Sequence, residues 1–94
     1  MDCSDLLFSG HAVRRMFQRG FKRQDITEIV AAGEIIASYS DDQPHPSFLL
    51  LGFSGETPIH VVVAQNQQDN VCVVVTAYIP DNKLWDDGFR KRKT

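Results

Sequence analysis

Hydrophobic and polar positions along the 94-residue chain change their period once, and this change divides the chain into a helical and a strand-forming part. Between residues 9 and 33, apolar side chains recur every three or four positions, which is the spacing of amphipathic helices. From residue 34 onwards, short runs rich in valine, isoleucine and leucine are separated by turn residues, which is typical of strands. Helices followed by consecutive strands predict a single α+β domain covering residues 1–94.

Two helices are predicted in the first part. The first covers residues 10–19, with Ser9 as N-cap and Gly20 just beyond the last turn. Its predicted buried side consists of Ala12, Val13, Met16 and Phe17, and its outer side of His11, Arg14, Arg15, Gln18 and Arg19. The second helix covers residues 22–32 and ends at Gly33. It opens with a lysine, which is a poor cap, and directs Ile26, Ile29 and Val30 inward.

The strands are expected to form a four-stranded antiparallel sheet with both helices packed on one face. They cover residues 34–40, 47–53, 58–65 and 71–79. Residues 5–8 form either a short first strand or packed coil. Residues 82–89 form a short helical turn that docks Trp85 and Phe89, and residues 90–94 form a mobile basic tail.

The last two strands indicate which face of the sheet receives the helices. Their apolar face consists of Ile59, Val61, Val63, Val71, Val73, Val75 and Ile79. If Gln65 pairs with Val71, His60 lies across from Thr76 on the other face, one step from Tyr78. This mixed face, with its imidazole, hydroxyl and phenol groups, is the predicted open surface.

The charges are segregated along the chain, although the net charge is only −2. Five of the ten Lys and Arg residues lie in residues 14–23 and five in residues 83–93, whereas eight of the twelve acidic residues lie between them. If the fold brings the two basic blocks together, they form one basic patch on an acidic body, which favours an anionic partner. The alternative is two separate solvated charge runs.

The remaining features exclude several classes of protein. The two cysteines, Cys3 and Cys72, are far apart and are expected to be reduced, as in a cytoplasmic protein. No apolar run reaches the roughly 18 residues of a membrane span, and the acidic N-terminus does not resemble a signal peptide. The histidines and cysteines lack metal-ligand spacing, so no metal and no other cofactor is expected.

The basic helix and the open sheet face carry the residue types that a metal-independent ribonuclease needs. Histidine transfers protons near neutral pH, and arginine binds phosphate through two nitrogens. The catalytic candidates are His11, Arg15, His60 and Tyr78, and the nucleic-acid-binding candidates are Arg14, Arg19, Arg90, Lys91 and Arg92. Each histidine also fits a purely structural role. An ion pair of Arg15 or Arg19 with Glu34 would likewise make the arginine stripe structural.

The segment HAVRRMFQRGF resembles the His-Ala-x-x-Arg-Met-x-x-Arg-Gly-Ile/Phe helix of a small bacterial family of unknown function. The resemblance continues through GEIIASY, PSFLLLG, IHVVVA and VTAYIPDNKLW, and covers roughly residues 9–92. In its layout that family is similar to the RelE/ParE and BrnT toxins, which belong to the barnase–EndoU–RelE-like folds.

This resemblance implies a toxin-like protein of a bacterial toxin–antitoxin pair, with an antitoxin-like protein as partner and RNA as ligand or substrate. In this interpretation Arg15 and Arg19 hold phosphate, His11 or His60 moves protons and Tyr78 orients the substrate. Two alternatives remain open. One is a non-catalytic binding module of the same fold, which the acidic net charge favours. The other is a ParE-like inhibitor directed at gyrase.

Overall fold

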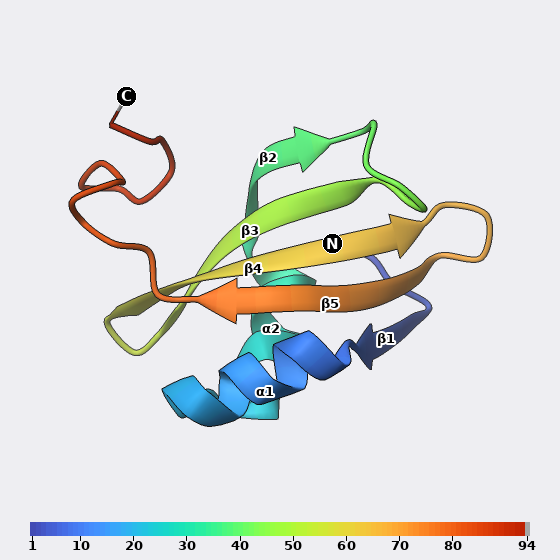
Figure 1. The fold of residues 1–94 in the computed structure, drawn as a ribbon, viewed down its shortest axis with the longest axis horizontal. Helices are drawn as coiled ribbons and strands as arrows, with labels where there is room; N and C mark the ends of the chain where they lie inside the picture. Colours follow the sequence, from blue (N-terminus) through green and yellow to red (C-terminus); the bar gives the residue numbers. More distant parts are fainter. Residues whose placement is uncertain (94) are drawn as a thin grey trace.

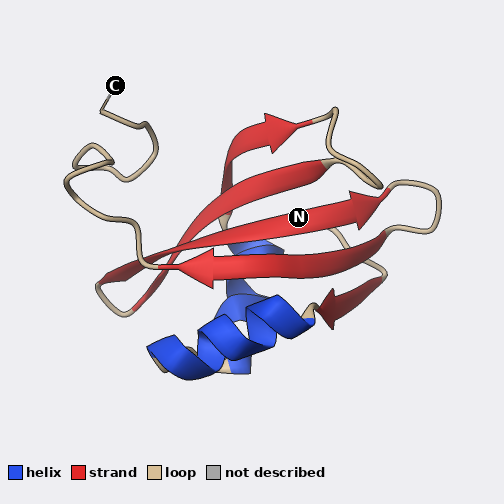
Figure 2. Cartoon of the chain, in the orientation of Figure 1, coloured by secondary structure: helices blue, strands red, loops and turns tan. Residues whose placement is uncertain are grey.

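The computed structural model describes residues 1–93, which form two helices and a five-stranded sheet (Figure 1). The elements in chain order are β1 (Asp5–Phe8), α1 (Gly10–Arg19), α2 (Arg23–Ala32), β2 (Glu34–Tyr39), β3 (Ser47–Ser54), β4 (Thr57–Asn66) and β5 (Val71–Tyr78). The strand order across the sheet is β1-β5-β4-β3-β2. Both helices lie on one side of the sheet (Figure 2).

The α+β class is confirmed, but the predicted four-stranded antiparallel sheet is wrong. Strands β2 to β5 form an antiparallel meander, and β1 adds a fifth strand that runs parallel to β5. Leu6 of β1 lies beside Cys72, and Phe8 lies beside Val74. A four-residue strand is too short to show a clear period, and its neighbour is far away in the chain. The pairing of β1 with β5 depends on the path of the chain between these two strands, and the local sequence pattern does not predict that path.

The ends of the helices follow the predicted local rules. The hydroxyl of Ser9 accepts a hydrogen bond from the backbone N–H of Ala12 at 3.0 Å, which caps α1. Gly20 ends α1 in the left-handed conformation with φ of 71°. Lys22, the residue before α2, makes no side-chain cap bond. These local predictions are confirmed.

One flank of α1 that the pattern assigned to the core is exposed. Ala12 and Met16 are buried, whereas Val13 is 53% and Phe17 is 89% exposed. At about 100° per residue, Phe17 lies about 140° around the helix axis from Ala12, outside the buried arc. The prediction that all four residues face the core is therefore wrong for Val13 and Phe17.

The core lies between the helices and one face of the sheet. It contains Ala12, Met16, Ile26, Ile29, Val30, Leu50, Ile59, Val61, Val63, Cys72, Val74 and Ala77. Helix α2 approaches β3 so closely that a Cβ at Gly52 would lie 2.5 Å from Cγ1 of Ile29. Glycine is thus required for this contact between the helix and the sheet.

The predicted register between β4 and β5 is wrong in two places. Asn66, rather than Gln65, lies opposite Val71. A bulge between Val62 and Val63 then shifts the register once more. A bulge inserts one unpaired residue and reverses the alternation beyond it, so the faces of β5 could not be derived from its period of two.

These shifts change which side chains of β5 face the helices. Cys72 and Val74 belong to the core, whereas Val71, Val73 and Val75, which were predicted to face the helices, do not. On the other face, His60 lies directly opposite Tyr78 rather than opposite Thr76. The imidazole and the phenol thus come closer than predicted.

Cys3 and Cys72 form a disulfide with their Cα atoms 5.8 Å apart, so the prediction that both are reduced is wrong. Cys3 precedes β1, and Cys72 lies near the start of β5. The parallel pairing of these two strands brings the cysteines together across 69 positions of sequence.

Residues 80–93 form turns and bends. The helical turn predicted over residues 82–89 is reduced to a single turn, in which the N–H of Trp85 donates to the carbonyl of Asp81 at 3.0 Å. Trp85 is 9% exposed and forms an isolated β-bridge with Arg92. This bridge folds the end of the described chain back on itself. Among residues 1–93, no helix has the length and apolar character needed to cross a membrane.

The segment predicted as a mobile tail makes specific backbone contacts. The N–H of Asp86 donates to the carbonyl of Lys91, and the N–H of Lys93 donates to the carbonyl of Leu84, both at 2.9 Å. Thr94, the last residue of that predicted tail, lies outside the described residues.

Candidate nucleic-acid interface

The exposed side of α1 combines cations with apolar side chains. It consists of His11, Val13, Arg14, Phe17 and Gln18, all exposed, which we call the helix surface. Helix α1 contains no acidic residue. The strand that precedes α1, β1, is short. Within residues 1–93, no other residue covers the side chain of Phe17. The helix surface is therefore an uncovered region with positive charge and one large aromatic ring.

Arg15 and Arg19 lie closer to the sheet than the helix surface does. Arg15 is half-buried and donates to the side-chain oxygen of Gln18 at 3.0 Å, within the same helix. Arg19 donates from Nη1 to the carbonyl oxygen of Ala77 at 2.8 Å. Since β1 pairs with β5 only as far as Val74, this carbonyl lies on the part of β5 beyond β1. Arg19 thus supplies a hydrogen-bond donor to β5 at its open edge.

Glu34 does not bind the arginines of α1. Both of its carboxylate oxygens lie 2.9 Å from Nε of Arg90 and share the single N–H of that atom, and this is the one salt bridge within residues 1–93. The interpretation of the Arg15 and Arg19 stripe as an ion pair with Glu34 is therefore wrong. In the described part of the chain, the cations of α1 have no carboxylate partner.

His60 is completely buried, and both of its ring nitrogens are engaged. Nε2 lies 2.8 Å from the carbonyl oxygen of Phe89, and a carbonyl can only accept, so Nε2 carries the proton. In the neutral ring Nδ1 is then an acceptor, and the hydroxyl of Tyr78 donates to it at 3.2 Å. The indole of Trp85 packs edge-on against the ring with centroids 4.5 Å apart.

Burial lowers the pKa of His60, and the hydrogen bond to Phe89 opposes that shift only in part. The ring is thus held neutral, with its one proton committed to a carbonyl. A neutral, enclosed imidazole with both nitrogens occupied is suited to holding the C-terminal segment in place.

Tyr78 is half-buried on the same face as His60. Burial raises the pKa of its phenol, the nearby Tyr39 raises it further and the guanidinium of Arg92 lowers it. The hydroxyl of Tyr78 is already the donor to His60, so its proton is engaged within the fold.

The C-terminal cations lie apart from those of α1. His60 faces away from the core, and the C-terminal segment that covers it lies on the face of the sheet opposite the helices (Figure 1). Arg90 is paired with Glu34, and Arg92 lies 5.8 Å above the ring of Trp85. Lys91 is exposed. The two basic blocks therefore form separate surfaces, as the alternative interpretation of the charge pattern held.

The catalytic candidates are likewise distributed over two faces. His11 and Arg15 are on α1, whereas His60 and Tyr78 face the C-terminal segment on the other side of the sheet. The structure brings His60 and Tyr78 together and separates them from His11. The residue that the sequence interpretation missed is Phe17, and its angular position on the helix was the available signal.

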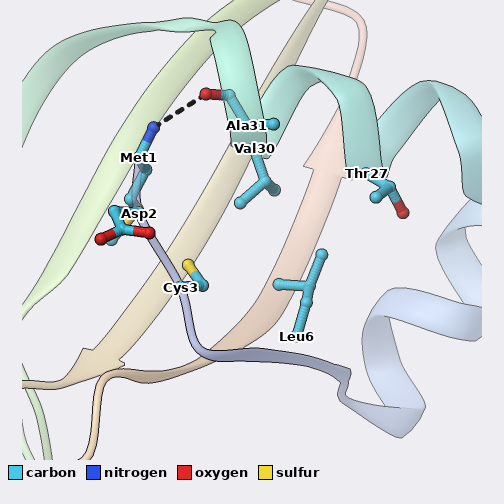
Figure 3. A pocket seen from close by; sticks show the side chains of 7 residues that line it. All are labelled: Met1, Asp2, Cys3, Leu6, Thr27, Val30 and Ala31. Carbon is cyan, nitrogen blue, oxygen red and sulfur yellow. Dashed lines mark hydrogen bonds between the residues drawn. The ribbon is translucent and has the colours of Figure 1, made fainter.

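A cavity of about 510 Å³ lies between the N-terminal segment and α2 (Figure 3). It is lined by Met1, Asp2, Cys3, Leu6, Thr27, Val30 and Ala31. The N-terminal amine donates to the carbonyl of Ala31 at 3.2 Å, across this cavity (Figure 3). A further cavity of about 320 Å³ lies on the other face of the sheet beside His45. Within residues 1–93, no cluster of three His, Cys, Asp or Glu side chains is arranged to hold a metal ion.

The model of the family described as "Domain of unknown function (DUF4258)" matches residues 8–79, and the chain belongs to this family. The match includes both helices and strands β2 to β5 and ends before Trp85 and Arg90. No curated protein and no solved structure is significantly similar to the chain.

Proposed function

We propose that this protein is a toxin-like, RNA-binding member of a bacterial two-protein pair, and that single-stranded RNA binds at the helix surface. One observation carries the proposal: the cations of α1 lack carboxylate partners in the described residues and flank a phenylalanine that is 89% exposed. Arginines without carboxylate partners attract phosphate, and an exposed aromatic ring provides a stacking surface for bases.

The local charge matters more here than the net charge of −2. Helix α1 carries three arginines and no acid, and Lys22 and Arg23 follow directly. The C-terminal block is less suitable because it lies among acids: Arg90 is paired with Glu34, and Asp86 and Asp87 are close in sequence. The helix surface is thus the stronger attractor of a polyanion.

Binding is better supported than cleavage. Cleavage without a metal needs a proton donor or acceptor and a phosphate-binding cation within reach of the same phosphate. His60 is enclosed with both nitrogens engaged, and His11 lies on a different face from Tyr78. If cleavage occurs, His11 beside Arg14 and Arg15 is the remaining candidate for proton transfer.

The test is the fluorescence anisotropy of a labelled single-stranded RNA, titrated with wild-type protein at several salt concentrations. Arg14→Glu is expected to weaken binding at least tenfold and to reduce the salt dependence by removing a phosphate contact. Phe17→Ala is expected to weaken binding about fivefold or more through lost stacking. Lys91→Glu is the matched control, because it reverses another exposed cation on the other face.

The proposal is wrong if Lys91→Glu weakens binding and Arg14→Glu does not, or if the wild type binds no RNA. The same samples, analysed on denaturing gels, distinguish binding from cleavage. Intact RNA supports binding alone, whereas fragments that disappear with His11→Ala would show cleavage at the helix surface.

The second candidate function is binding of a protein partner, which for a toxin-like protein would be antitoxin-like. Val13 and Phe17 are exposed at positions i and i+4, and such pairs anchor a helix in an apolar groove of another protein. In this case Phe17→Ala removes binding to the partner and leaves RNA binding unchanged. A gyrase-directed role would instead produce growth arrest with intact RNA.

A further inference from the structure

The strand β2 is an edge strand of the sheet. It pairs with β3 on one side, and no strand of residues 1–93 lies on the other. Its sequence, EIIASY, contains no lysine or proline, two residues that commonly block strand addition at edges, and its one charged residue, Glu34, lies at the end of the strand. Besides its hydrogen bonds to β3, the backbone of β2 makes a hydrogen bond at one end, where the N–H of Asp42 donates to the carbonyl of Tyr39 at 3.2 Å.

A bulge in β2 places the two ends of the strand on one face. Glu34 lies opposite Leu51 and Tyr39 lies opposite Ser47, and the register shifts between Ile35 and Ala37. Leu51 and Ser47 are four residues apart on β3, so they point to the same face of the sheet. Glu34 and Tyr39 therefore share that face, although they are five positions apart in sequence.

We propose that β2 pairs with β2 of a second copy of this chain, antiparallel about a twofold axis between Ile36 and Ala37. Residues directly opposite each other in an antiparallel pair must lie on the same face of the sheet. Glu34 and Tyr39 meet this condition because of the bulge. Each copy then places Glu34 opposite Tyr39 of the other, and Ile35 opposite Ser38.

The chemistry of these opposed residues is complementary. A phenol donates to a carboxylate, and this contact occurs twice in a twofold arrangement. Tyr39 is 44% exposed, and the side chain of Glu34 is 50% exposed despite its bond to Arg90, so both have room for a further partner. Ile35, 46% exposed, would be covered, and no like charges would face each other.

This complementarity favours a second copy over an unrelated strand, because both halves of each contact are supplied by the same six residues. The product is one continuous ten-stranded sheet across the axis. The proposal does not depend on RNA binding, since the helix surface is on α1 and not on β2.

The experiment measures the molar mass of the full chain by size exclusion with light scattering, up to millimolar concentration, with a non-reducing gel to exclude intermolecular disulfides. The wild type is expected at twice the chain mass of 10.6 kDa. Ile35→Lys is expected to weaken dimerisation at least tenfold, because a buried cation would interrupt the new pairing. Tyr39→Phe removes only the hydroxyl and is expected to weaken it about threefold to tenfold, as for a charge-assisted hydrogen bond.

Leu84→Lys is the matched control, because Leu84 is 48% exposed and does not belong to β2. It is expected to leave the dimer unchanged. A monomeric wild type at all concentrations would overturn the proposal. So would a dimer that survives Ile35→Lys, or one that is lost equally in Leu84→Lys. Circular dichroism of each variant confirms that it is folded.

Discussion

Nε2 of His60 donates a hydrogen bond to the carbonyl oxygen of Phe89 at 2.8 Å, and this contact joins β4 to the C-terminal segment. The other ring nitrogen accepts from Tyr78 at 3.2 Å. One neutral side chain thus fixes a neighbouring strand and a distant loop at the same time. The stability of the C-terminal segment is therefore expected to depend on the protonation of His60.

Stability is expected to decrease as the pH falls below neutral, because burial lowers the pKa of His60 from its ordinary 6.5. With a lower pKa in the folded state, the unfolded chain binds more protons between the two values. The stabilisation is thus fully present above pH 6.5 and is lost as the pH falls through the folded pKa. Urea titrations between pH 8 and 5.5 measure this slope.

The control for this effect is His60→Leu, which cannot titrate at this position. It is expected to be about 1–3 kcal/mol less stable at pH 8, because the Phe89 carbonyl and the Tyr78 hydroxyl lose their partner. Its stability is expected to change less with pH than that of the wild type. An equal slope in both proteins would show that His60 is not the titrating group.

Arg19 is expected to contribute to stability, unlike Arg14 on the same helix. Arg19→Met keeps the apolar stem and removes the donor to the Ala77 carbonyl, which is expected to cost about 1–2 kcal/mol. Arg14→Met changes an exposed side chain and is expected to remain within about 0.5 kcal/mol of the wild type. Urea unfolding at one pH compares the two variants, and equal stabilities would contradict the role of Arg19 at the β5 edge.

Gly52 is expected to tolerate no side chain. In Gly52→Ala the new methyl group would lie 2.5 Å from Cγ1 of Ile29, so α2 would have to move away from β3. The expected loss of stability is about 1–3 kcal/mol, as for overpacking in other cores. Gly10→Ala is the comparison, since its nearest atom would be Nη1 of Arg14 at 3.7 Å. Thermal unfolding should show a lower midpoint only for Gly52→Ala.

The disulfide between Cys3 and Cys72 is expected to stabilise the fold by about 2–4 kcal/mol, because it closes a long loop in the unfolded chain. Urea unfolding with and without a reducing agent measures this difference. Cys3→Ser should have the stability of the reduced wild type and should not respond to the reductant. A wild type that is equally stable in both conditions would show that the bond is not formed in solution.

Local features of this protein could be derived from the sequence because they depend on neighbours in the chain. The cap at Ser9, the left-handed Gly20 and the weak cap at Lys22 each involve atoms within a few residues. The strands from β2 to β5 were recognised for the same reason, since side-chain volume and branching favour extended backbone. The α+β class follows from their order.

The tertiary structure decided everything that depends on pairing between distant segments. A single bulge after Val62 changed which residues of β5 face the core, and placed His60 opposite Tyr78. Parallel pairing of β1 brought Cys3 to Cys72. Arg90, rather than an arginine of α1, reached Glu34.

The candidate interface divides in the same way. The sequence by itself determined that α1 carries cations without acids, because this is a property of ten consecutive residues. Only the tertiary structure decided that Phe17 is exposed, that His60 is enclosed and that the two basic blocks lie on opposite faces of the sheet. The physical reason is that helix periodicity orders side chains around one axis, whereas burial depends on which segments of the folded chain cover them.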